Sequence, residues 1–118
     1  MDNHVADFIV NLVSESPEVA GVYRQHIADQ GELLPHVLMG EITRLVIAST
    51  ARTEASDWRT KLLVRLESGI ESGGDDVAEL VGVSFVENLC GENAAIEILL
   101  PEMGNALRKE LKSICGVN

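Results

Sequence analysis

Hydrophobic residues recur at helical spacing along almost the whole chain. In the first segment they fall at positions i, i+3, i+4, i+7 and i+8, which places them on one face of a helix. These positions are Val5, Phe8, Ile9, Leu12 and Val13. No convincing run shows the strict alternation that is typical of a half-buried strand. The pattern therefore predicts helices from one end of the chain to the other.

Proline, glycine and small polar residues divide this pattern into segments. Ser16-Pro17 gives an N-cap followed by proline in the first helical position, and Gly31 is a natural residue to end that second helix. Further helices should begin near Pro35, at Ser56 or Asp57, at Asp75 or Asp76, and after Gly91. Pro101 interrupts the last of them and should kink it or split it in two.

The expected fold is all-α. The segment 75–89 is apolar nearly all round, so we expect it to form the buried centre. Six or seven helices with short connections predict a bundle or a short stack of helices. The 118 residues fit one domain, 1–118, and no repeat survives residue-by-residue comparison, which disfavours a helical-repeat solenoid.

Composition adds that the domain is acidic. Hydrophobic residues make up 46% and charged residues 24%, which is typical of a globular protein, and the formal net charge is −10. That excess disfavours binding to nucleic acid or to anionic membranes, and it favours a basic protein partner. The alternative is that the charge only keeps a small protein soluble.

The negative charge is concentrated in one part of the sequence. Residues 67–97 contain no Lys or Arg, whereas residues 35–66 contain five. We predict a partner-binding acidic corner where the fourth helix ends and the fifth begins. Its residues are Glu67, Glu71, Asp75, Asp76 and Glu79. Glu67 and Glu71 are like charges near a helix C-terminus, a locally unfavourable arrangement that points weakly to a partner, although a solvated face is the simpler interpretation.

We find no catalytic, cofactor-binding or metal-binding motif. Gly73-Gly74 lacks the residues of a phosphate-binding loop and is read as a helix breaker. No Gly-x-Ser-x-Gly nucleophile motif occurs, and the histidines lack the spacing of metal ligands. His26 is expected to be a half-buried residue of an amphipathic helix.

Two polar residues stand inside the helix that we expect to be most buried. Glu87 and Asn88 would there need hydrogen-bond partners, so we predict a structural network, with a functional contact as the alternative.

The two cysteines, Cys90 and Cys115, each precede a glycine near the end of a predicted helix. We expect both cysteines to be free thiols that act as small apolar side chains in a reducing compartment. A disulfide between them is the alternative if the two helix ends meet. The N-terminal residues lack the basic and apolar regions of a secretory signal, so a cytoplasmic location is expected.

Three stretches together resemble a family of small, uncharacterised bacterial helical proteins classed as a domain of unknown function. They are Gly31–His36 running into Met39-Gly40-Glu41, Val83–Leu89, and Leu99–Gly104 followed by Leu107. The resemblance spans roughly residues 5–115 and implies no catalytic residues. Small acidic helical proteins are also similar in style to immunity proteins, which neutralise a cognate toxin.

Three functions are compatible with these features. The first is a non-enzymatic protein-binding domain, such as an immunity protein that neutralises a bacterial toxin through the acidic corner. The second is a small enzyme or ligand-binding regulator with a pocket between helices, anchored by His36, Glu41 or Glu87. The third is an oligomeric scaffold, which would show a large exposed apolar patch.

Overall fold

The structure, a computed structural model, describes residues 4–52 and 57–116. All regular structure in these two ranges is helical, so the predicted all-α class is confirmed. The elements are α1 (His4–Val13), α2 (Pro17–Gln30), α3 (Pro35–Ser49), α4 (Asp57–Ser72), α5 (Asp75–Val81), the π-helical segment η1 (Gly82–Val86), α6 (Glu87–Leu89), α7 (Asn93–Leu99), the 3-10 turn η2 (Leu100–Glu102) and α8 (Asn105–Cys115).

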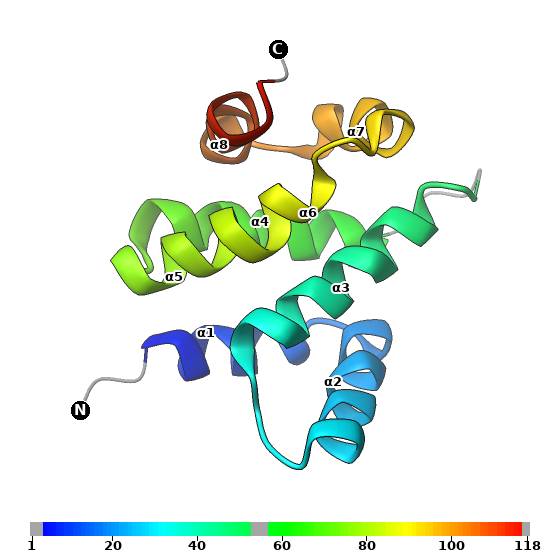
Figure 1. Ribbon diagram of the computed structural model, residues 1–118, viewed down its shortest axis with the longest axis vertical. Coiled ribbons are helices and arrows are strands. Elements are labelled where there is room, and N and C mark those ends of the chain that lie inside the picture. Colours follow the sequence, from blue (N-terminus) through cyan, green and yellow to red (C-terminus); the bar gives the residue numbers. More distant parts are fainter. Residues whose placement is uncertain (1–3, 53–56, 117–118) are drawn as a thin grey trace.

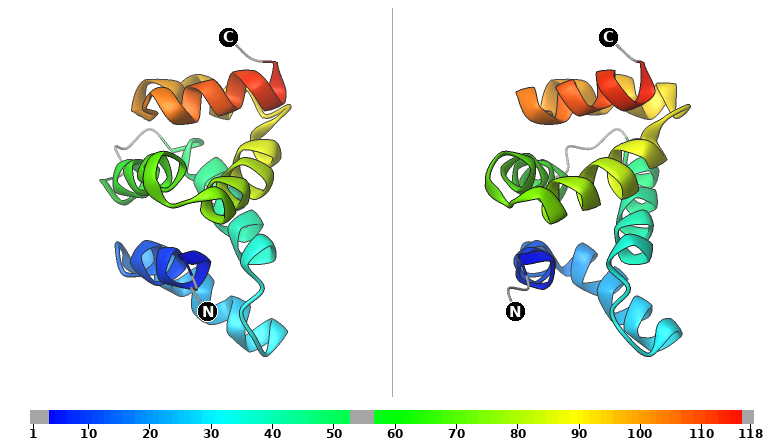
Figure 2. Two further views of the ribbon diagram at one scale, coloured as in Figure 1. Left: turned by 90° about the vertical axis from the view of Figure 1, so that its left-hand side faces the viewer. Right: turned by 60° about the vertical axis from the view of Figure 1, so that its left-hand side comes forward.

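The helices form three layers (Figures 1 and 2). The first holds α1 and α2, the middle holds α4 and the rod made by α5, η1 and α6, and the third holds α7 and α8. Helix α3 runs from the first layer into the middle one. Counting the rod as one helix, the described residues hold seven helices, within the predicted six to seven.

Several helices begin and end at the residues that the sequence predicted. Ser16 Oγ accepts the Val19 N–H at 3.2 Å, and Pro17 occupies the first turn of α2. Gly31 ends that helix in the left-handed conformation with φ 75°. The prediction for Pro101 is also confirmed, because α7 ends at Leu99 and α8 starts afresh at Asn105. Ser56, one of the two proposed caps of α4, lies outside the described residues.

One buried cluster of apolar side chains joins these helices. It draws residues from α1 to α8 and includes Phe85, the largest fully buried side chain. Close approach between α1 and α4 depends on Gly69, where a Cβ would lie 2.6 Å from the Phe8 ring. The first layer therefore packs on the middle one at the point where the Phe8 ring lies against Gly69.

The rod of residues 75–89 lies at the centre of the fold, as predicted, but it is not buried all round. Val83 is 46% exposed, and Glu79 and Glu87 are exposed as well. Burial of Glu87 and Asn88 was predicted wrongly, since both side chains are exposed. The expected structural hydrogen bonding is found for Asn88, which donates to the Ser84 carbonyl oxygen, but no such contact is found for Glu87 among the described residues. The rod has one exposed face, formed by positions 79, 83 and 87, which follow one another at intervals of four residues.

The π-helical stretch is stabilised by side chains that bind its backbone. The carbonyl oxygen of Ser84 accepts Thr43 Oγ1 at 3.1 Å and Asn88 Nδ2 at 2.6 Å. Such irregular backbone needs alternative hydrogen-bond partners, and here α3 and the rod itself supply them.

The expectation of two free thiols is wrong. Cys90, just after α6, and Cys115, the last residue of α8, form a disulfide with Cα atoms 5.2 Å apart. The two helix ends meet, which was the condition that the sequence left open. The cysteines lie 25 positions apart, and the segment between them contains α7, η2 and most of α8. This disulfide therefore closes the third layer on the middle one.

Candidate functional site

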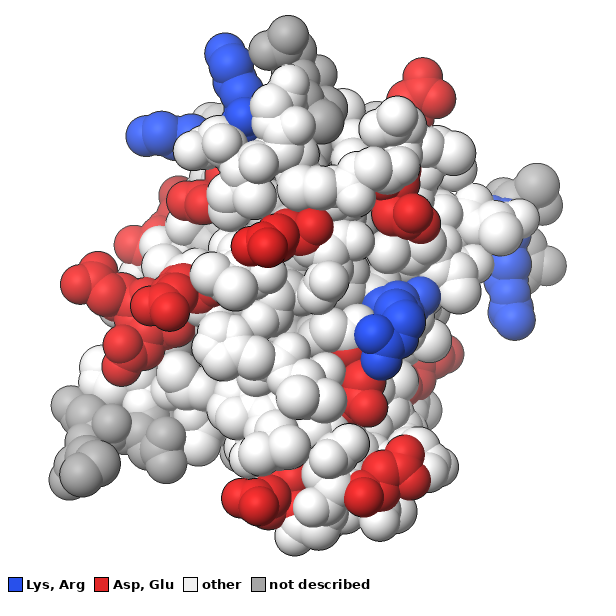
Figure 3. All heavy atoms as spheres, viewed as in Figure 1, with Lys and Arg blue, Asp and Glu red and all other residues white. Residues whose placement is uncertain are grey.

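The acidic corner lies at the turn between α4 and α5. Gly73 and Gly74 make this turn, and Gly74 has a φ of 89°, a backbone conformation that favours glycine. Acidic side chains gather beside the start of α5, at the left-hand edge of Figure 3. The structure therefore brings the end of α4 and the start of α5 together, as the sequence suggested.

Four of the five predicted residues point into solvent. Glu71, Asp75, Asp76 and Glu79 are all exposed, and we call them the four outer carboxylates. Among the described residues none of the four forms an ion pair or accepts a side-chain hydrogen bond. Their negative charge is therefore not balanced within the described part of the fold.

The fifth residue, Glu67, has a different role. Its carboxylate accepts the backbone N–H of Ala106 at 2.6 Å and that of Leu107 at 2.9 Å. These are two of the otherwise unpaired N–H groups at the start of α8, where the helix dipole favours negative charge. The unfavourable position of Glu67 near the end of α4 is thus explained by a contact inside the chain, and Glu67 does not belong to the free surface.

Two hollows are lined by outer carboxylates, and a third shares His4 and Gly73 with the first of them. One, of about 320 Å³, lies between His4, Gly73, Gly74, Asp75 and Asp76. A second, also about 320 Å³, is lined by Asp76, Glu79 and His36 together with apolar residues of α1, α3 and α5. The first two hollows share Asp76, so the surface around this carboxylate is indented on both sides.

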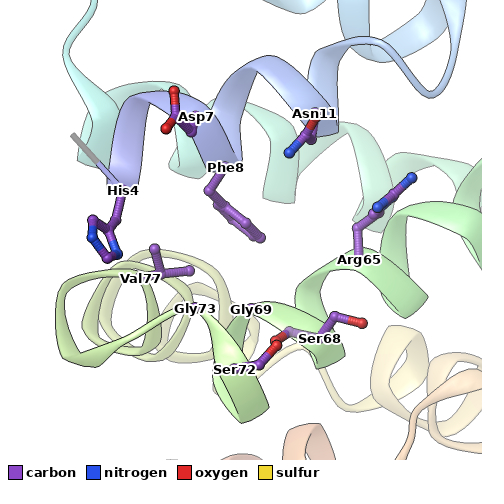
Figure 4. A pocket seen from close by; sticks show the side chains of 10 residues that line it. All are labelled: His4, Asp7, Phe8, Asn11, Arg65, Ser68, Gly69, Ser72, Gly73 and Val77. Carbon is purple, nitrogen blue, oxygen red and sulfur yellow. The ribbon is translucent and has the colours of Figure 1, made fainter. Parts of the chain in front are cut away.

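The third hollow, of about 330 Å³, lies between α1 and the α4–α5 turn (Figure 4). The Phe8 ring points from α1 into the space between these helices, and the Arg65 side chain extends from α4 at the end of the hollow where Asn11 lies. The Arg65 guanidinium donates to Glu15 at 2.5 Å, so its charge is partly balanced. Asp7 and His4 line the opposite end, nearest the outer carboxylates.

The residues proposed as anchors of an enzyme or ligand pocket do not converge. His36 Nδ1 lies 2.5 Å from Ser84 Oγ, and Glu41 Oε1 lies 2.8 Å from His26 Nδ1. Glu87 is exposed on the rod. The hollow that His36 lines contains neither Glu41 nor Glu87. In the described residues His36 and Glu41 thus make separate contacts, and the enzyme or ligand-binding alternative stays a prediction.

His26 is buried, where the sequence predicted a half-buried residue. Its Nε2 accepts the Leu34 N–H at 3.0 Å, so that nitrogen carries no hydrogen. The remaining hydrogen is on Nδ1, which donates it to Glu41 Oε1. His26 thus ties α2 to the loop before α3 and to α3 itself. Leu34 and Glu41 lie 8 and 15 residues from His26, so no local sequence pattern indicated these two hydrogen bonds.

A buried arginine is the other polar contact that the sequence did not reveal. Arg59 is 5% exposed and binds both carboxylate oxygens of Glu102, at 3.0 and 2.6 Å. Its third nitrogen donates to Ser49 Oγ at 3.0 Å. This contact joins α4, η2 and the end of α3, and it uses a bidentate geometry that only arginine provides.

Neither metal ligation nor membrane crossing is supported by the part of the chain that the structure describes. Residues 4–52 and 57–116 contain no group of three or more His, Cys, Asp and Glu side chains able to hold a metal ion. None of the helices described is long and apolar enough to cross a membrane.

Comparison with known proteins gives the family but no function. A family model described as a domain of unknown function, DUF7674, matches residues 9–116. The chain belongs to this family. No curated protein and no solved structure matches it. The match to DUF7674 carries no information on bacterial origin or on likeness to immunity proteins.

The stretches that suggested the DUF7674 resemblance make structural contacts in this chain. In the first, Leu34 and Glu41 hold His26. In the second, Ser84 lies in η1. In the third, Glu102 binds Arg59, and Met103 and Leu100 carbonyl oxygens accept the Arg108 guanidinium. In this chain, residues of these stretches therefore contribute contacts that hold the fold together.

Proposed function

We propose that this DUF7674 domain is a non-enzymatic protein-binding domain whose acidic corner engages a basic partner. The observation that carries the proposal is the set of four outer carboxylates, which are exposed and have no ion-pair partner among the described residues. Opposite charge on a partner would balance them and accelerate association, an effect that weakens as salt screens the charges.

Helix physics accounts for part of this surface and leaves the rest to be explained. Asp75 and Asp76 stand at the start of α5, where the helix dipole favours them. Glu71 stands in the last turn of α4, which holds no basic residue. Asp75 and Glu79 are like charges four residues apart on one helix, which costs roughly 0.2–0.5 kcal/mol. Glu71 and Glu79 therefore support a role outside the fold.

The hollows beside the carboxylates favour a protein partner whose side chains enter them over one that only rests on a flat charged surface. Asp76 lies between two indentations of about 320 Å³ each, and both are lined by further acidic side chains. A lysine or arginine side chain could enter either one, burying its aliphatic part while its charge meets a carboxylate. A toxin domain with a basic surface, neutralised by an immunity protein, is the partner class that we propose.

Coexpression with the product of the adjacent gene tests this function. We expect a complex that forms at low salt and weakens as the salt concentration rises from about 0.05 to about 0.5 M. Replacing the four outer carboxylates by lysine should weaken it at least about ten-fold, or about 1.4 kcal/mol. The matched comparison sets the double variant Glu71→Lys/Glu79→Lys against Glu92→Lys/Glu97→Lys. Both pairs change the net charge equally and all four residues are exposed, but Glu92 and Glu97 lie at α7.

Two results would count against the proposal. If no complex forms at low salt, a toxin-neutralising role with this neighbour is ruled out. If a complex forms but the control variants weaken it as much as the corner variants, net charge alone is responsible and the corner is not the interface.

The cytoplasmic location stays a prediction. The disulfide between Cys90 and Cys115 counts against it, because disulfides persist mainly in oxidising compartments.

A further inference from the structure

The last turn of α8 is held much less firmly than the rest of the helix. Leu107 and Leu111 are buried in the core, and they secure the first two turns. From residue 112 to 116, where the described part of the chain ends, Cys115 alone is not exposed, and Ile114 is 38% exposed. Apolar packing is therefore sparse over the last turn, where Cys115 contacts the core and the disulfide adds a covalent attachment.

That last turn covers the π-helical segment of the rod. The sulfurs of Cys90 and Cys115 lie 3.7 and 3.6 Å from the carbonyl oxygen of Val86, the last residue of η1. Gly82, the first residue of η1, is buried under Glu110 and Ile114 of α8, since a Cβ there would lie 3.4 Å from Glu110 Oε2 and 3.5 Å from Ile114 Cδ1. Figure 2 shows α8 directly above the rod.

We propose that the Cys90–Cys115 disulfide is a redox-sensitive latch, which holds the last turn of α8 over η1. Its reduction releases this turn and uncovers Gly82 and Val86 while the rest of the fold stays intact. The latch rests on contacts at the far end of the rod from the acidic corner, so it does not depend on the proposed partner.

The chemistry of opening is thiol–disulfide exchange with a dithiol reductant. One thiolate of the reductant attacks a sulfur of the pair, forming a mixed disulfide and releasing the other cysteine as a thiolate. The second thiol of the reductant then displaces the first cysteine and completes the reductant's own disulfide. Two electrons pass to the protein, and Cys90 and Cys115 each take up one proton. Both cysteines are partly exposed, so a reductant can reach them in the folded protein.

The opening is local because the start of α8 is fixed independently. Glu67 binds the N–H groups of Ala106 and Leu107, and the Leu107 and Leu111 side chains remain in the core. Without the disulfide, residues 112–116, all exposed except Cys115, can unwind from the C-terminal end, where helices fray most easily.

Hydrogen exchange measured by mass spectrometry on the full chain, oxidised and reduced with dithiothreitol, tests the latch. In the reduced protein, we expect exchange to rise at least about ten-fold in residues 112–116 and in 82–86, with α1 to α3 unchanged. Removing the reductant and restoring the disulfide should restore protection. The Cys90→Ser/Cys115→Ser variant should match the reduced protein and should not respond to dithiothreitol.

Several outcomes would overturn the latch. Free thiols in protein purified without reductant would show that the bond does not form. Resistance to dithiothreitol until the protein is denatured would make the bond purely structural, as would loss of protection throughout α1 to α3. If the serine variant does not fold, reduction and reoxidation of the natural chain still decide between these results.

Discussion

The carboxylate of Glu67 occupies the space that a side chain at position 104 would need. A Cβ on Gly104 would lie 2.5 Å from Glu67 Cδ and 2.8 Å from each carboxylate oxygen. Gly104 is the N-cap residue of α8 and has no side chain to cap the helix, so Glu67 caps it from the middle layer. The start of α8 is therefore fixed by a residue 37 positions earlier in the chain.

Gly104→Ala should destabilise the fold by about 1–2 kcal/mol, the usual cost of losing a helix cap. The new methyl group would push the Glu67 carboxylate away from the Ala106 and Leu107 N–H groups. Glu67→Gln should cost less, since one oxygen remains to accept a hydrogen bond but the charge is lost. Urea denaturation of the variants measures both effects.

The control for this pair is Glu71→Gln, one turn further along α4. Glu71 is exposed and has no partner among the described residues, so its replacement should change stability by less than about 0.5 kcal/mol. Equal effects at positions 67 and 71 would refute the capping role of Glu67.

Glu102→Gln should destabilise the protein by about 2–4 kcal/mol, because it leaves the buried guanidinium of Arg59 without its countercharge. The comparison is Glu15→Gln, which removes the partner of Arg65. Arg65 is 51% exposed, so water can replace the lost contact and the cost should stay below about 1 kcal/mol. Thermal or urea unfolding that shows similar losses for both variants would contradict a buried, structural ion pair.

Sequence reasoning succeeded where the determining signal was local. Ser16 and Pro17 start α2, Gly31 ends it, and Pro101 separates α7 from α8, each within a few residues of the feature it controls. The general position of the acidic corner was also predictable, since Gly73-Gly74 ends one helix just before the next begins.

What the sequence could not show depends on contacts between distant residues. Glu67 looked like part of a charged surface because its partners, the N–H groups at positions 106 and 107, lie in another layer. Glu87 looked buried because apolar residues surround it in the sequence, although it lies on the one exposed face of the rod with Glu79 and Val83. The cysteines bond only because the ends of α6 and α8 meet in the folded chain.

His26→Phe should cost about 2–4 kcal/mol, because the Leu34 N–H and the Glu41 carboxylate both lose their partner in a part-buried setting. In the natural protein, nitrogen-detected NMR should find the single ring hydrogen on Nδ1. Glu41→Gln keeps an oxygen that can accept from Nδ1 and should cost less. A ring hydrogen on Nε2 would contradict the hydrogen bond from Leu34.

Gly69→Ala and Gly21→Ala should change stability in opposite directions. Both glycines are inside helices, where alanine is intrinsically favoured by about 1 kcal/mol. At Gly21 the nearest atom to a new Cβ would be Arg24 Nη2 at 3.9 Å, so the full gain should appear. At Gly69 the Cβ would lie 2.6 Å from the Phe8 ring, and overpacking should produce a net loss of about 1–2 kcal/mol.

The Phe8 ring is the specific cause of that loss, and a second substitution tests it. Phe8→Leu removes the ring from the surface of Gly69, so Gly69→Ala should cost less in the Phe8→Leu background than in the natural chain. Urea denaturation of the four proteins in this double-mutant cycle gives the coupling free energy between the two positions. If Gly69→Ala costs the same with and without the ring, α1 does not pack on α4 through this contact. The shape of the third hollow would then differ from the one described, since Phe8 and Gly69 both line it.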